Sequence, residues 1–390
     1  MTMSTPETAT ADTMVLLAIG TKKGLFLAAS EDRVNWTLSD PHFLILEASS
    51  VAIDTRNGAP RVLAGLLDWH WGPTVVTSDD LGATWSDPEQ GAIKFPEDTG
   101  AALERVWHLR PDAASRPGVV WAGAEPHSLW RSEDGGSTFE LNRGLWDHPQ
   151  RKSWQPGGGG PCLHTVDPDP DSEQIHIAAS AAGVYRSDDG GATWEAANRG
   201  ISAGFLPGEE PEYGQCVHRI ARDAEQPGRL YAQNHGGVYR SDDAGRKWVS
   251  IADGLPGDFG FTFLTHPRIG GTGWVIPMIA DIERIPSGAR VSVYKTADGG
   301  DTWTENHTGL PDQDFNTILR DASAVDDHPD STGVYFGTRA GEVYASADEG
   351  ATFTQVAQRL PDVLSVRAAV VPKTDLPQGS EQYVPQFPEE

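Results

Sequence analysis

The stretch SDDGGATW at residues 187–194 recurs in variant form along the whole chain. Related octapeptides stand at 78–85, 132–139, 241–248, 296–303 and 346–353, and a shortened copy, SEDRVNW, begins at Ser30. Their third-position aspartates are Asp32, Asp80, Asp134, Asp189, Asp243, Asp298 and Asp348, which puts the repeat period near fifty residues. That period, with several short strands in each unit, is typical of a β-propeller. Seven copies predict seven blades.

Each unit carries short runs rich in β-branched and aromatic residues before its octapeptide. Examples are RVLAGLL followed by TVVTSDD at 61–80, and RLYAQNH followed by GVYRSDD at 229–243. These runs predict antiparallel strands separated by glycine-containing turns. Within the octapeptide, glycine permits positive φ, aspartate bonds local backbone N–H groups, and Trp or Phe packs inward. We interpret the octapeptide as a structural turn.

The two ends of the chain complement each other. The first unit has two strand-like runs, MVLLAIGT and GLFLAAS, and lacks an innermost strand, whereas VLSVRAAVV at 363–371 is a strand without a unit. We therefore predict an all-β, seven-bladed propeller whose ring is closed by this C-terminal strand joining the N-terminal blade. The predicted propeller domain spans residues 14–373, between a disordered N-terminal segment, 1–13, and a loose C-terminal tail, 374–390.

The octapeptide resembles the Asp box of the sialidase superfamily and of related BNR-repeat propellers, including sortilin-type receptors and photosystem II assembly propellers. The resemblance covers essentially the whole chain and implies the fold, but that fold hosts glycosidases, lyases, receptors and assembly factors. A sialidase has six blades and needs an arginine triad. Its Arg-Ile-Pro motif precedes the first box, whereas here Arg284, Ile285 and Pro286 stand in the sixth unit. We expect that this chain is not a true sialidase.

Composition restricts the partners. The chain has 30 Lys and Arg against 56 Asp and Glu, a formal net charge of −26, which opposes binding to nucleic acid or to an anionic membrane surface. The first residues contain no signal-peptide pattern, and two cysteines are too few for a disulfide framework. We expect a cytoplasmic protein. The sequence gives no prediction of its oligomeric state.

Propeller connectivity predicts where a site can form. Because the Asp boxes are turns between the third and fourth strands, the connections between blades and between second and third strands gather on the opposite face. We predict an active site at the mouth of the channel on that face. We expect the protein to be a hydrolase or lyase acting on a small organic or carbohydrate substrate. The expected catalytic residues are the carboxylates Glu104, Glu125 and Glu212 and the anion contacts Arg105 and Arg284.

Three histidines stand on successive predicted inner strands. His108, His164 and His218 precede their box aspartates by 26, 25 and 25 residues, so we expect them at equivalent places near the channel. With His127 and His235 from loops, they suit one divalent transition metal, Zn, Mn, Fe or Cu. Two alternatives stay open, namely acid/base groups beside Glu104 or Glu212, and structural histidines with satisfied hydrogen bonds.

Cys162 and Cys216 each precede one of these histidines by two residues. We expect them to be small buried core residues, with metal ligation as the alternative.

A different class of function is also compatible with the sequence. The rival to an enzyme is a non-catalytic propeller scaffold whose acidic face binds a protein or peptide partner. An enzyme predicts a deep polar pocket, whereas a scaffold predicts a wide, shallow face with an exposed apolar patch.

Overall fold

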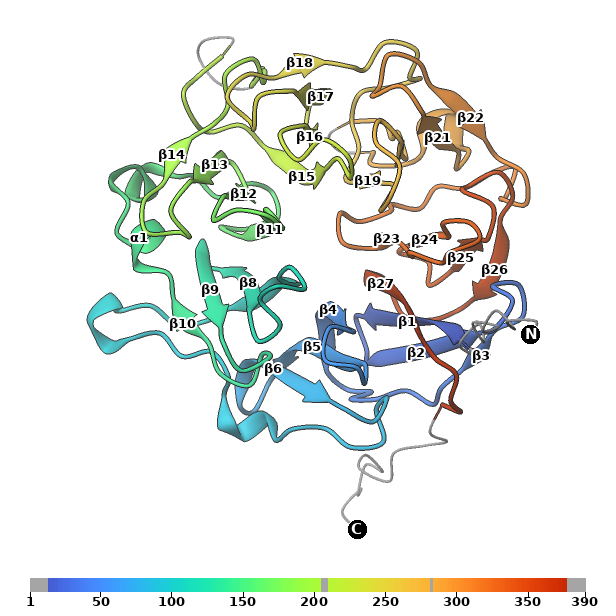
Figure 1. Cartoon of the computed structure of the whole chain (residues 1–390), viewed down its shortest axis with the longest axis horizontal. Coiled ribbons are helices and arrows are strands. Elements are labelled where there is room, and N and C mark those ends of the chain that lie inside the picture. The colour runs from blue at the N-terminus through green and yellow to red at the C-terminus, as the bar shows by residue number, and fades with distance from the viewer. Residues whose placement is uncertain (1–12, 205–209, 281–282, 377–390) are drawn as a thin grey trace, which may run out of the picture.

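The computed structural model describes residues 13–204, 210–280 and 283–376. Within them, seven antiparallel sheets stand as blades around a central axis, and the chain runs once around the ring (Figure 1). The predicted seven-bladed propeller is confirmed. In the described residues, helical structure is limited to α1 (Arg143–Trp146) and four short 3-10 turns. The expected disordered segment, 1–13, and tail, 374–390, lie almost entirely outside the described residues.

Six blades have four described strands and the second has three. From the inner strand outward, the first three blades are β27 (Val363–Pro372), β1 (Thr13–Thr21), β2 (Leu25–Ser30) and β3 (Thr37–Leu38); β4 (Glu47–Asp54), β5 (Arg61–Asp68) and β6 (Gly72–Ser78); and β7 (Arg105–Pro111), β8 (Val120–Glu125), β9 (Ser128–Ser132) and β10 (Glu140–Leu141). The fourth and fifth are β11 (Leu163–Pro168), β12 (Ile175–Ala179), β13 (Gly183–Ser187) and β14 (Glu195–Ala196); and β15 (Val217–Arg222), β16 (Leu230–Asn234), β17 (Val238–Ser241) and β18 (Val249–Ser250). The sixth and seventh are β19 (Phe263–Thr265), β20 (Gly273–Val275), β21 (Val293–Thr296) and β22 (Thr304–Asn306); and β23 (Ser323–Val325), β24 (Val334–Gly337), β25 (Val343–Ser346) and β26 (Thr354–Ala357).

The last strand closes the ring. β27 pairs antiparallel with β1 from Thr13 opposite Pro372 to Thr21 opposite Val363, so the two ends of the chain share one blade (Figure 1). This pairing supplies the inner strand that the first unit lacks. It also satisfies the backbone edge that β1 would otherwise present to the channel.

The Asp boxes are structural turns. In the fourth blade, the Asp189 carboxylate accepts hydrogen bonds from the backbone N–H and the side-chain hydroxyl of Thr193, at 2.8 and 2.6 Å. The Ser187 hydroxyl accepts from the Gly191 N–H at 2.8 Å, and Gly191 has a φ of +92°, which favours glycine. Trp194 is buried between blades. The backbone bonds recur in the other complete boxes, and the hydroxyl bond recurs in all of them except 241–248, where Lys247 replaces the threonine, which confirms the interpretation from sequence.

The hydrophobic core lies between neighbouring blades. Because strand side chains alternate between the two faces of a sheet, each blade offers one apolar face to each neighbour. Leu129 of the third blade, for example, packs in one cluster with Ile177 and Tyr185 of the fourth. Burying a large apolar side chain of this kind contributes about 1.5 to 3 kcal/mol. No helix among the described residues is long and apolar enough to cross a bilayer.

Candidate functional site

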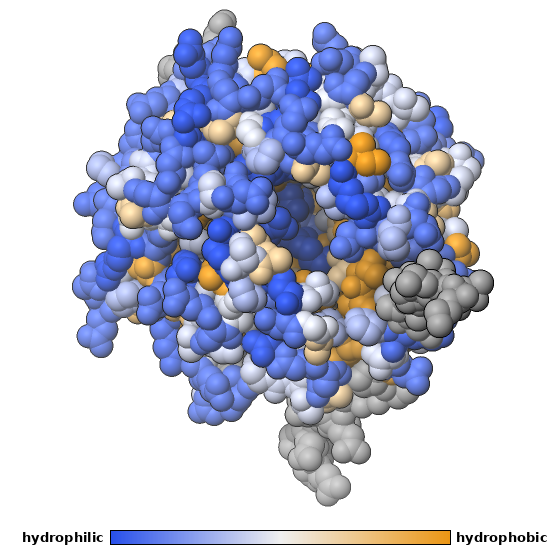
Figure 2. Space-filling model, in the orientation of Figure 1, coloured by the Kyte–Doolittle hydropathy of each residue, from blue (hydrophilic) through white to orange (hydrophobic). Residues whose placement is uncertain are grey.

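A cavity of about 710 Å³ opens at the mouth opposite the Asp boxes. It is lined by turns between second and third strands, which supply Lys22, Ala181 and Arg339, and by connections between blades, which supply residues 155–159 and Asp362. A view along the axis shows a central hollow with hydrophilic residues at its depth (Figure 2). The cavity therefore forms on the face where the connectivity predicted an active site.

Five inner strands carry a β-bulge at their mouth end. The extra residue is Ser49 in β4, Trp107 in β7, His164 in β11, His218 in β15 and Leu364 in β27, as the shifts in strand pairing show. A bulge redirects a side chain and often adjoins a functional site. Ser49, Trp107 and His218 line the cavity, whereas His164 is buried.

The expected equivalence of the three inner-strand histidines is wrong for His108. His108 pairs with Gly123 one step beyond the bulge, the place that Thr165 and Arg219 hold in the next two blades. The connection after β7 is longer than those after β11 and β15, so equal spacing to the box does not give equal ladder position. His108 therefore faces the channel below the mouth, with Nε2 3.8 Å from Asp321 Oδ1.

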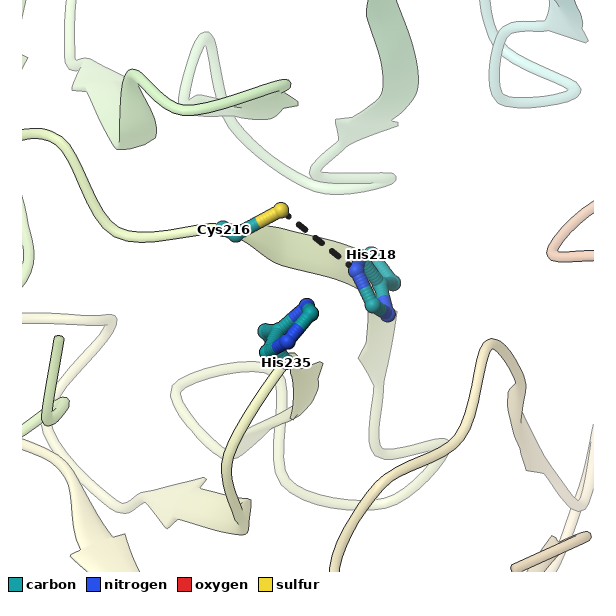
Figure 3. A group of neighbouring side chains, drawn as sticks. All are labelled: Cys216, His218 and His235. Atoms are coloured by element: carbon teal, nitrogen blue, oxygen red, sulfur yellow. Dashed lines mark hydrogen bonds between the residues drawn. The ribbon is translucent and has the colours of Figure 1, made fainter. Parts of the chain in front are cut away.

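Cys216, His218 and His235 converge on one point of the cavity wall (Figure 3). One ligand atom from each lies within 4.8 Å of the other two, and Cys216 Sγ is 3.4 Å from His218 Nε2. Cys216 immediately precedes β15, His218 is the bulge residue near the start of that strand, and His235 follows β16 in the turn toward β17. The backbone N–H of His235 donates to the Cys216 carbonyl at 2.9 Å, which fixes the turn against the strand.

The neighbouring blade holds the His218 ring. Nδ1 donates to the Gly260 carbonyl at 2.7 Å, so Nε2 faces Cys216. Phe261 packs against the ring with centroids 4.6 Å apart, and Phe259 meets both His218 and His235 edge to face. A histidine whose second nitrogen bonds a carbonyl is the usual arrangement for a metal ligand.

The two cysteines have opposite electrostatic environments. Burial would raise the pKa of Cys216, but hydrogen bonds with His218 and His235 and the charge of the nearby Arg320 outweigh it and lower that pKa to about 5. Burial raises the pKa of Cys162 to about 11. Only Cys216 is thus poised as a thiolate.

The donor set fits a transition metal. A thiolate and two imidazoles favour zinc or copper over manganese, because manganese prefers oxygen ligands. In tetrahedral zinc geometry, ligand atoms are roughly 3.5 Å apart. The ligand atoms of the cluster lie within 4.8 Å of one another, so small side-chain movements would bring them to that spacing.

Arginines surround the same cavity. Arg320 lies between Trp107 and Phe261, with its guanidinium carbon 5.4 Å from each ring centroid. The Arg105 guanidinium carbon lies 5.2 Å from the Trp107 ring centroid, and that of Arg284 lies 5.6 Å from the Phe261 centroid. Arg320 makes no ion pair within the described part of the chain, and its Nε is buried without a hydrogen-bond partner there. The mouth is therefore locally cationic in an acidic protein.

The carboxylates lining the cavity are paired. Glu47 contacts both Lys22 and Arg105, and Asp362 pairs with Arg339 at 2.8 Å. Asp321 has its pKa lowered, because Arg367, His108 and Arg219 outweigh the effect of burial. Each of these three lining carboxylates therefore has a basic partner in the described part of the chain.

The structure separates the residues expected from sequence into two groups. Arg105, Arg284, His218 and His235 line the cavity, and the first two interleave with its aromatic rings. Glu104 and Glu212 are exposed, and Glu125 accepts from Trp107 Nε1 at 2.8 Å just outside the lining. His127 Nε2 bonds the Ser180 carbonyl at 2.9 Å, away from the Cys216 cluster.

Two residues of the site were missed or undervalued. Cys216 has a sequence signal, since it stands two residues from His218, but the bulge at His218 lies outside what the sequence reveals. Arg320 precedes Asp321 in a stretch that contains no recognisable motif, so the sequence gives no signal of its role in the site.

The fold and site define a class. The chain is a seven-bladed Asp-box propeller with a sialidase-like fold and a mouth cavity, and the BNR/Asp-box repeat pattern matches residues 185–196. An oligoxyloglucan-reducing end-specific xyloglucanase of Emericella nidulans is 24% identical over 320 residues, covering 71% of this chain and 36% of that protein. A xyloglucanase of Hypocrea jecorina is 24% identical over 306 residues, covering 78% and 30%. The chain thus spans about a third of the length of these relatives.

Solved structures give the same fold. A GH74 enzyme of Niastella koreensis superposes with a TM-score of 0.51 at 16% identity, over 79% of this chain and 45% of that one. A Bacteroides uniformis protein, provisionally assigned as a 6-phosphogluconolactonase, gives 0.56 at 13% identity, over 92% and 99%. At these identities the similarity shows the fold alone.

Proposed function

We propose that the protein is a hydrolase acting on an acidic carbohydrate or a related small organic acid, with Cys216, His218 and His235 holding a divalent transition metal. The observation that carries this proposal is the convergence of the three ligands on the wall of a deep cavity. The distant similarity to xyloglucanases supports a carbohydrate substrate. The depth of the cavity favours an enzyme over a partner-binding scaffold.

The charge pattern favours ester or lactone hydrolysis over glycosidic cleavage. Glycoside hydrolysis needs a protonated carboxyl group to donate to the leaving oxygen. The described carboxylates of the cavity, Glu47, Asp321 and Asp362, are each paired with a basic side chain. Hydrolysis of an ester or lactone needs an activated water and a cation for the developing oxyanion. Arg320 would supply that cation and then hold the carboxylate product.

Each protein group has a separate role in this scheme. A bound transition metal supplies Lewis-acid polarisation and activation of water. His218 is oriented by the Gly260 carbonyl, and Phe259 and Phe261 exclude water from the ligand side. Trp107 offers a flat face to a sugar ring. A reducing, cytoplasmic location would keep Cys216 available as a ligand.

The test combines metal content with activity. Untagged protein is loaded with zinc, dialysed and analysed by elemental mass spectrometry, and hydrolysis of a panel of sugar-acid lactones and esters is followed by proton release. We expect about one metal ion per chain and activity in the wild type, and loss of both in Cys216→Ala and His235→Ala. His127→Gln is the matched control, since this buried turn histidine lies outside the cluster. Metal retained in Cys216→Ala, or lost equally in His127→Gln, overturns the proposal.

A further inference from the structure

A second cavity lies below the mouth, further along the inner strands toward the Asp-box face. It measures about 300 Å³ and is lined by inner strands of all seven blades. The layer between the two cavities contains His108, Arg219 and Arg367 around the buried carboxylate of Asp321. Alanines, among them Ala52, Ala221 and Ala324, occupy equivalent ladder positions and leave the space open.

Four arginines line this cavity, and the carboxylates that pair with them are unevenly distributed. Arg222 is neutralised by Asp167 and Asp169 at 2.9 and 3.0 Å. Arg219 and Arg367 share the single carboxylate of Asp321. The exposed Arg110 side chain makes no ion pair or hydrogen bond within residues 13–204, 210–280 and 283–376, although the carboxylates of Asp167 and Asp112 lie near enough to attract it.

A hydroxyl group accompanies the unpaired guanidinium. Thr165 lines the cavity from β11 and is 2% exposed, and its Oγ1 has no hydrogen-bond partner in the described part of the chain. A buried polar atom without a partner needs an explanation, such as a bound ion or water. Arg110, Arg219 and Thr165 thus present unused donors to one cavity.

We propose that this channel cavity is a binding site for a phosphate-type oxyanion, separate from the catalytic mouth. Arg219 and Arg367 share one carboxylate and Arg110 makes no ion pair, so the cavity wall carries guanidinium charge that an anion neutralises, and phosphate accepts several charge-assisted hydrogen bonds at once. The cavity volume suits inorganic phosphate or a small phosphomonoester. Neutral His108 adds no charge, since burial lowers its pKa well below the usual range.

Calorimetric titration with inorganic phosphate at constant ionic strength tests this site. We expect one phosphate per chain, about tenfold or more weaker binding in Arg110→Gln and several-fold weaker binding in Thr165→Val. Arg61→Gln is the matched control, because it removes the same charge at the Asp-box face, where Arg61 pairs with Asp79. A titration with glycerol 3-phosphate distinguishes the source, since tighter binding than phosphate identifies an organic phosphate and weaker binding identifies the free ion.

Two outcomes overturn the proposal. One is the absence of phosphate binding in the folded wild type, or unchanged affinity in both Arg110→Gln and Thr165→Val. The other is loss of binding in Arg320→Gln together with retention in Arg110→Gln, which would place the anion in the mouth. Circular dichroism verifies that each variant is folded, and the conservative Thr165→Val change keeps the test valid if Arg110→Gln does not fold.

Discussion

The Nδ1 atom of His218 lies 2.7 Å from the carbonyl oxygen of Gly260, which leads into the next blade. Because a carbonyl only accepts, Nδ1 must carry the proton that it donates. The opposite nitrogen is then directed at Cys216 Sγ. A single bond between blades thereby sets the direction in which the imidazole can bind a metal.

Replacing His218 by Phe should remove the ligand and keep the packing. An aromatic ring would still contact Phe259 and Phe261, so we expect the metal-free free energy of unfolding to change by about 1 kcal/mol, the value of one hydrogen bond. Zinc at one hundred times its Kd should stabilise the wild type by about 2.7 kcal/mol and leave the variant unchanged. Urea unfolding with and without zinc measures both effects. Equal stabilisation of the variant by zinc would contradict the assignment of His218 as a ligand.

His164 and His108 should respond differently to Leu. Both ring nitrogens of His164 are buried without a partner among the described residues, so His164→Leu should leave stability unchanged or increase it. His108 Nδ1 accepts from the Val166 N–H, so His108→Leu leaves a buried donor unpaired and should cost about 1 to 3 kcal/mol. Thermal and urea unfolding of the two variants makes the comparison. A loss of about 2 kcal/mol in His164→Leu would instead show that a bound water or ion satisfies this imidazole.

The Asp boxes should make stability depend on acid pH. Hydrogen bonds from the side chain and backbone of Thr193 hold the pKa of Asp189 down to about 2, against an ordinary value of 3.8. The unfolded chain therefore binds more protons, and the contribution of Asp189 is complete above pH 4 and lost as pH falls through about 2. We expect Asp189→Asn to destabilise the protein more at pH 7 than at pH 2.

Urea unfolding at the two pH values, followed by circular dichroism, checks this difference. Asp253→Asn, an exposed change in the turn after β18, should have no effect at either pH. An identical loss of stability in Asp189→Asn at pH 7 and pH 2 would show that the carboxylate charge does not matter.

The strand that closes the ring should not tolerate proline. Ala368 pairs with Leu17 in the middle of the β1–β27 ladder, and proline there removes a backbone donor from a strand with a neighbour. We expect Ala368→Pro to cost about 3 kcal/mol or more and to promote association through the exposed edge of β1. Asp375→Pro, beyond the end of β27, should be neutral. Unfolding and analytical ultracentrifugation give the two readouts, and a stable monomer in Ala368→Pro would contradict the role of this pairing.

The repeat made the fold predictable, because each Asp box needs its own residues in sequence order. The spacing from Asp32 to Asp348 gave the blades, and the missing inner strand of the first unit gave the closure by Val363–Pro372. The repeat spacing and the number of strands in each unit can both be read directly from the sequence. Connectivity also placed the mouth on the correct face.

The interior of the site was less predictable, because it depends on single-residue offsets. A bulge at Trp107 and a longer following connection move His108 out of the layer that holds His218. Arg320 acquires its place only when two aromatic residues from other blades, Trp107 and Phe261, flank it. Neither of these two relationships can be predicted from one continuous stretch of sequence.

The pairing of β27 with β1 also constrains the order of folding during synthesis. The strand made first remains without its inner partner until residues 363–372 have left the ribosome, although the intervening blades can already be packed. Contacts of such wide sequence separation form slowly, because the whole chain must be ordered before they are made. The nascent protein is therefore an open arc with one unpaired edge, and it becomes a closed disc in a single late event. We expect chaperones that shield exposed strand edges to bind this open form, and we expect proteases to cleave it more readily than the closed propeller.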